Sequence, residues 1–139
     1  MAKGKKFRGA EIVREIDSAL DKGLARFLIL SQGKLSKASP VDSGRFASSW
    51  FIGAGVPNRS TAAERPKGAR DVEISKPTQK ITMASDHYVS NNLPYAERVC
   101  FDPKYAKGGS GGPAWFTTIV NNLGRDAEKS FDFFLKKVK

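Results

Sequence analysis

An apolar residue recurs every fourth position through the first quarter of the chain. The residues are Ile12, Ile16, Leu20, Leu24 and Leu28. This spacing follows the turn of an α-helix and places the side chains on one broad stripe. We therefore predict a helix over residues 9–35, with Gly33 as a stop signal.

A second amphipathic segment lies at the other end of the chain. Its apolar positions keep helical spacing at Phe116, Ile119, Val120, Leu123, Ala127, Phe131, Phe134, Leu135 and Val138. Pro113 suits the first turn of a helix, where its missing N–H costs nothing. We predict one long helix over residues 113–137, with Gly124 as its weak point.

The middle of the chain has shorter extended patterns. An apolar segment covers residues 51–56, an alternating one residues 71–75, and two more, residues 80–85 and 87–91, read as separate strands or as one hairpin. Residues 94–100 fit one or two helical turns, with Pro94 at the first position and Asn92 as cap. We expect an α+β fold, in which the long N-terminal and C-terminal helices pack on a small antiparallel β-sheet.

The 139 residues suit one domain over residues 9–139, preceded by a basic arm at residues 1–8. A long loop at residues 57–80 is rich in Pro, Gly and charge, and residues 102–112 resemble a flexible linker. Loops of this length in small domains are usually functional, or disordered until they meet a partner.

A junction joins the first helix to the first apolar segment at residues 39–50. Pro40 ends the helix, and Asp42 or Ser43 can cap a short turn. Gly44 permits a tight bend, and Trp50 is a large apolar anchor. Taken alone, these features describe a well-formed loop without chemistry.

The chain is strongly basic, with 24 Lys and Arg against 14 Asp and Glu and a net charge of +10. That balance suits nucleic acid, an acidic protein or an anionic surface, and equally a solvated basic face. The candidates to face DNA are Lys3, Lys5, Lys6 and Arg8. No apolar run is long enough to cross a membrane, and the basic N-terminus lacks the apolar core of a secretory signal.

The sequence gives little support for catalysis or for metal binding. His87 is the single histidine and has Ser85, Asp86 and Ser90 as its neighbours, but adjacent residues on a strand point to opposite faces. One histidine and one cysteine, Cys100, cannot form a structural zinc site or an intrachain disulfide. We expect neither an enzyme nor a cofactor.

Several residues are candidates for contacts between subunits. Four aromatic residues lie at element edges, where they serve either the edge of the core or an interface: Trp50, Tyr88, Tyr95 and Trp115. The long loop adds Arg59, Arg65 and Arg70.

Two short motifs give a more specific indication. The first is Pro40-Val41-Asp42-Ser43-Gly44-Arg45-Phe46 with Ser49-Trp50, and the second is Ser90-Asn91-Asn92-Leu93-Pro94-Tyr95-Ala96. In their order and spacing they resemble the neck and tail-completion proteins of tailed bacteriophages, the minor-tail-protein-Z-like group. The resemblance covers residues 10–137. The chain departs from the family pattern in its long 57–80 loop and at Phe101-Asp102-Pro103, where a Tyr-Gly-like turn is common.

The resemblance implies a virion structural protein that forms a ring, a hexamer or a dodecamer, at the neck, the head–tail interface or the tail end. Its partners would be copies of itself, portal, adaptor or tail proteins, and the DNA in transit. It would be assembled in the host cytoplasm and reside in the virion, and the 57–80 loop would reach a neighbouring subunit. The alternative is a small basic nucleic-acid-binding protein, monomeric and sensitive to salt.

Overall fold

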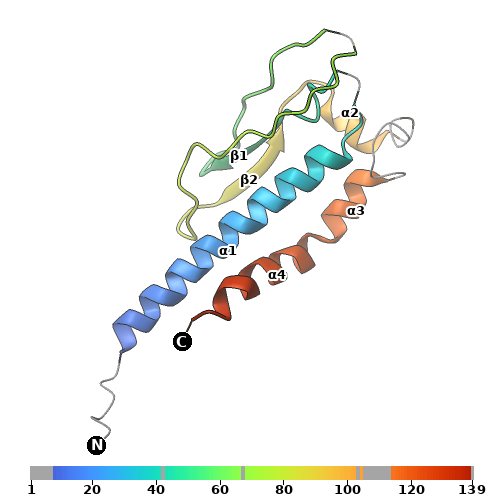
Figure 1. The fold of residues 1–139 in the computed structure, drawn as a ribbon. Coiled ribbons are helices and arrows are strands. Elements are labelled where there is room, and N and C mark those ends of the chain that lie inside the picture. The colour runs from blue at the N-terminus through green and yellow to red at the C-terminus, as the bar shows by residue number, and fades with distance from the viewer. Residues whose placement is uncertain (1–7, 42, 67, 103, 105–113, 139) are drawn as a thin grey trace, which may run out of the picture.

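The computed structural model describes residues 8–41, 43–66, 68–102, 104 and 114–138. Its elements in order are α1 (Gly9–Ala38), β1 (Trp50–Ala54), β2 (His87–Asn91), α2 (Ala96–Phe101), α3 (Trp115–Asn121) and α4 (Leu123–Leu135). Figure 1 shows α1 as a long spine, with the two-stranded sheet on one side and α4 on the other. The predicted α+β class is confirmed. Within it, α4 packs against α1.

Helix α1 runs past Gly33 and ends at Ala38, so the predicted stop was too early. The helix continues because Leu35 and Ser36 are buried and still have neighbours to pack against. Ser39 closes it, since both its N–H and its hydroxyl donate to the Leu35 carbonyl. Pro40 follows at once, as predicted.

The contact between α1 and α4 is close in the middle and incomplete at one end. Gly23 faces Phe131, and a Cβ at Gly23 would lie 2.6 Å from the Phe131 ring. Lys34 and Asp126 form an ion pair of 2.6 Å between the two helices. Toward the N-terminus of α1, Ile12 and Ile16 remain 37% and 38% exposed. The apolar stripe is therefore buried along only part of its length.

The sheet pairs segments that are distant in sequence. β1 and β2 are antiparallel, with Trp50 opposite Asn91 and Ala54 opposite His87. Residues 71–75 and 80–85, predicted as possible strands, are not strands, and the hairpin expected around residues 85–86 is absent from this described region. Thr82 and Ser85 instead close a turn. β2 pairs with β1 because Trp50 and Ile52 supply a buried face beside α1.

The predicted C-terminal helix is divided in two at Asn122. The side-chain amide of Asn122 donates to the Thr118 carbonyl, and this local hydrogen bond competes with regular helix geometry. Helix α2 begins at Ala96, after Tyr95, and no side chain caps it. The predicted cap at Asn92 was therefore wrong, and the start of α2 lies two residues after Pro94.

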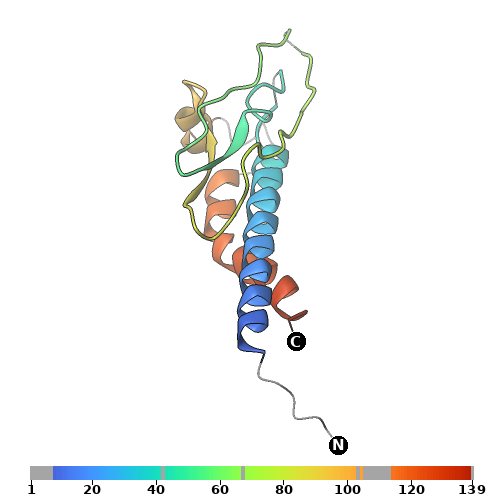
Figure 2. The ribbon, with the colours of Figure 1, turned by 90° about the vertical axis from the view of Figure 1, so that its left-hand side faces the viewer.

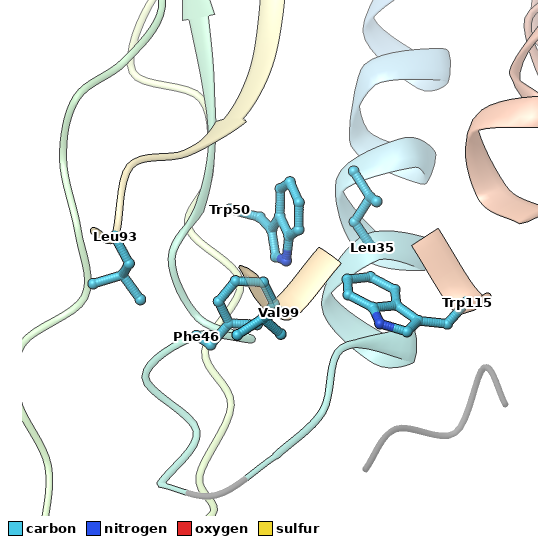
Figure 3. Packing of buried hydrophobic residues seen from close by; sticks show 6 residues of the cluster. All are labelled: Leu35, Phe46, Trp50, Leu93, Val99 and Trp115. Atoms are coloured by element: carbon cyan, nitrogen blue, oxygen red, sulfur yellow. The ribbon is translucent and has the colours of Figure 1, made fainter. Parts of the chain in front are cut away.

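The core lies at the C-terminal end of α1, where α1 meets the junction, the sheet, α2 and α3. It consists of Leu35, Phe46, Trp50, Leu93, Val99 and Trp115 (Figure 3). These residues come from α1, the junction, β1, the turn after β2, α2 and α3. Within the described ranges, no helix is long and apolar enough to span a membrane.

Candidate functional site

The two sequence motifs lie against each other. The Asn91 amide donates to the Phe46 carbonyl at 2.9 Å. The ring of Phe46 lies 6.3 Å from that of Tyr95, between centroids, and Phe46 shares the core with Leu93. The two motifs, distant in sequence, therefore pack directly against each other in the folded chain.

Both tryptophans proposed as interface candidates belong to the core of their own chain. Trp50 is 5% exposed and Trp115 is 2% exposed. The indole N–H of Trp50 donates to the Ser39 hydroxyl at 2.9 Å, and its ring stacks on Phe116 of α3. The sequence left two roles open for these tryptophans, at the edge of the core or at an interface. The structure places both in the core.

The two tyrosines remain available for contacts. Tyr88 on β2 and Tyr95 before α2 are each 38% exposed. Near Tyr95, Phe101 is 61% exposed, and both line an open hollow beside α2. These side chains can meet a partner without any rearrangement of the core.

The long loop is fastened to the junction by two neighbouring serines. The N–H of Ala62 donates to the Ser49 hydroxyl at 3.0 Å, and the N–H of Glu73 donates to the Ser48 hydroxyl at 2.9 Å. Both serines are almost fully buried. Each limb of the loop therefore docks on one serine of the junction.

Gly44 permits the return limb, which we define as residues 71–75, to approach the junction. Its φ is +84°, a conformation that favours glycine, and a Cβ there would lie 1.9 Å from the Asp71 carbonyl oxygen. The turn after it is closed by a hydrogen bond from Ser48 N–H to Gly44 O. Ser43 accepts from Arg45 N–H at 3.4 Å, as a turn cap would, whereas Asp42 lies outside the described residues.

Two glutamines complete the attachment. The Gln32 amide, 1% exposed in α1, donates both to Trp50 O and to Ser75 O, each at 2.8 Å. The Gln79 side chain accepts from Ala54 N–H at 3.0 Å. Sequence reasoning missed these roles. The available signals were a glutamine inside an apolar helix and a Ser-Ser pair before Trp50.

The tip of the long loop extends beyond the C-terminal end of α1 in both views (Figures 1 and 2). Arg59 lies near the start of the loop, where the Asn92 amide donates to the Arg59 carbonyl at 3.3 Å. Arg59 and Arg70 are exposed, and Arg70 has a φ of +59°. Arg65 is half-buried and donates to the Asp71 carbonyl, so it helps to close the tip. Arg59 and Arg70 are thus the better placed for an outside partner.

Of the candidates to face DNA, only Arg8 lies within the described residues; Lys3, Lys5 and Lys6 lie outside them. Arg8 forms ion pairs with Glu11 at 2.6 Å and Glu15 at 3.8 Å. The hydrogen bond from Arg8 to Glu11 raises the pKa of Arg8 above its ordinary value. This side chain is already engaged on the first turns of α1.

The residues around His87 do not form a catalytic triad. Both ring nitrogens of His87 are buried and have no hydrogen-bond partner among the described residues. The hydroxyl of Ser90 instead donates to the Asn58 carbonyl. Burial raises the pKa of Cys100 to about 11, which disfavours the reactive thiolate. In the part of the chain that the structure describes, no group of side chains could hold a metal ion.

No family model matches the sequence, and no curated protein or solved structure matches it significantly.

Proposed function

We propose that the chain is a virion structural protein that forms a ring at the neck, the head–tail interface or the tail end of a tailed bacteriophage. The main support is the ordered pair of motifs at residues 40–50 and 90–96. The contact between Asn91 and the Phe46 carbonyl gives a physical reason for the two motifs to occur together in one chain. The motifs build the scaffold, and the neighbouring loop and tyrosines supply the contacts.

The surface supports a role in binding other proteins. Ile12, Val13 and Ile16 are exposed near the N-terminus of α1, and Tyr95 and Phe101 are exposed near the other end of the molecule. Exposed apolar side chains gathered in this way commonly mark interaction sites. A protein that joins two neighbours needs such surfaces at more than one place.

The excess positive charge is compatible with a ring through which DNA passes. With a net charge of +10, the walls of such a ring would not repel the phosphate backbone. Tight binding is not required, because each phosphate contact adds affinity that would slow transit. The same charge also suits the alternative, a monomeric nucleic-acid-binding protein.

The mass of the purified protein in solution distinguishes these two functions. We expect light scattering to give one discrete oligomeric mass at low and at high salt, because protein contacts hold a ring together. A mobility-shift titration with duplex DNA should accompany it. A strict monomer at both salt concentrations, with DNA affinity that falls steeply as salt rises, would contradict the ring and favour the alternative.

A further inference from the structure

The outer edge of β1 is bonded at both ends by glutamine side chains. Gly55 N–H donates to Asp86 O, so Gly55, Gly53 and Phe51 point their backbone groups toward β2. Trp50, Ile52 and Ala54 therefore point away from it. Gln32 donates to Trp50 O at one end of this edge, and Gln79 accepts from Ala54 N–H at the other. Proteins commonly protect strand edges, and here two side chains do so.

The outer edge of β2 has no comparable protection. By the same alternation, the backbone N–H and C=O groups of His87, Val89 and Asn91 point away from β1. No described residue forms a hydrogen bond to these backbone groups. The neighbouring Tyr88 is 38% exposed, and His87, Val89 and Asn91 are themselves partly exposed. We call these outward groups the β2 edge.

The return limb offers a second open edge. Asp71, Glu73 and Ser75 are bound to their own chain, since Arg65 donates to Asp71 O, Glu73 N–H donates to Ser48, and Gln32 donates to Ser75 O. The backbone groups of the residues between them, Val72 and Ile74, have no partner among the described residues. The limb thus has the two-residue alternation of a strand, with one side docked and one side free.

The side chains of the return limb are also typical of a strand. Val72 is 41% exposed and Ile74 is 46% exposed, and both are β-branched. Such residues favour strands, where they pack against cross-strand neighbours. In the isolated chain these two residues have a strand's composition and alternation but no strand beside them.

We propose that neighbouring copies of this chain join by strand addition, with the return limb of one copy pairing along the β2 edge of the next. The β2 edge offers the outward backbone groups of His87, Val89 and Asn91, and the return limb offers those of Val72 and Ile74, so each edge has the hydrogen-bonding groups that the other requires. The occupant of each edge is therefore a second copy. This inference rests on the proposed ring and names the contact that builds it.

The proposed contact also accounts for a ring. The two edges are different surfaces of one chain, so the contact is head-to-tail and leaves one free edge on every added copy. Such contacts close into a ring when the rotation between copies allows it. In a closed ring, every β2 edge and every return limb is paired.

Proline at Ile74 tests the limb without disturbing its own attachment. The Ile74→Pro variant loses a free backbone N–H, whereas the bonds of Glu73 and Ser75 to their own chain remain. We expect self-association, measured by sedimentation over a dilution series, to weaken about tenfold or more, a loss of about 1.4 kcal/mol. The control Ile74→Thr keeps the N–H and the β-branched shape and should associate like the wild type.

Cross-linking tests the β2 edge. One sample carries Val72→Cys and another Tyr88→Cys, both with Cys100→Ala, and a short flexible bis-maleimide joins nearby thiols. We expect cross-linked dimers when the samples are mixed and allowed to exchange, and none in either sample alone. Cross-links within a single sample, no cross-link in the mixture, or an unimpaired Ile74→Pro variant would overturn the inference.

The experiments can reject the proposed contact without rejecting the proposed function. A wild-type chain that stays monomeric at every concentration would also overturn strand addition between copies. The proposed virion role would then still be decided by the protein content of purified particles. A ring whose assembly is unaffected by Ile74→Pro would preserve the proposed function and reject only the contact.

Discussion

Replacing Trp50 with alanine should destabilise the protein by about 3 kcal/mol, the usual cost of removing a large buried aromatic side chain. Trp50 is 5% exposed, packs edge-on against Phe46 and stacks on Phe116. It therefore joins β1 to the junction and to α3, and its loss leaves a cavity between all three. Ser39 keeps its hydrogen bond to Leu35, so the cost comes mainly from lost packing.

Thermal or urea unfolding measures this effect, and Tyr88→Ala is the matched control. Tyr88 is an aromatic residue of the same sheet but is 38% exposed, so its truncation should change stability by only about 0.5 kcal/mol. Equal effects of the two substitutions would mean that Trp50 is not the central packing residue described above.

Replacing Gly44 with alanine should release the return limb from the junction. The substitution meets two penalties, because the φ of +84° disfavours a side chain and the new Cβ would lie 1.9 Å from the Asp71 carbonyl oxygen. The first penalty alone is about 1–2 kcal/mol. The clash is with backbone, so the limb itself has to move. We expect faster amide hydrogen exchange at Glu73, whose N–H is bonded to Ser48.

The control for Gly44→Ala is Gly55→Ala. Gly55 has nearly the same φ, +79°, but a Cβ added there would meet no atom within 4 Å beyond its chain neighbours. It should show the conformational penalty without release of the limb. Equal exchange rates at Glu73 in the two variants would contradict a specific contact between Gly44 and the return limb.

The helices could be predicted from sequence because their signals are local. The four-residue spacing of Leu20, Leu24 and Leu28 lies within one element, and Pro40 ended α1 as expected. The break at Asn122 was missed because apolar spacing continues through it. The division is marked instead by local hydrogen bonds of Asn122, from its side chain to Thr118 O and from its backbone N–H to Ile119 O.

The contacts of the long loop could not be predicted in the same way. They join residues that are distant in sequence, such as Gln32 with Ser75, and they use side chains to bind backbone groups, which leaves no periodic pattern. The pairing of β1 with β2 was also hidden, because a nearer partner at residues 80–85 had a comparable strand pattern. The tryptophans were named from sequence, but only burial distinguishes core from interface.

The protein content of purified phage particles decides whether this chain is part of a virion. Under the proposed function a tailed phage encodes this chain, and quantitative mass spectrometry of that phage's particles gives the number of copies per particle. We predict that the chain is present, in a copy number that is a multiple of the ring symmetry and that persists after a high-salt wash. Its absence from intact particles, or its complete removal by salt, would contradict a structural role in the virion.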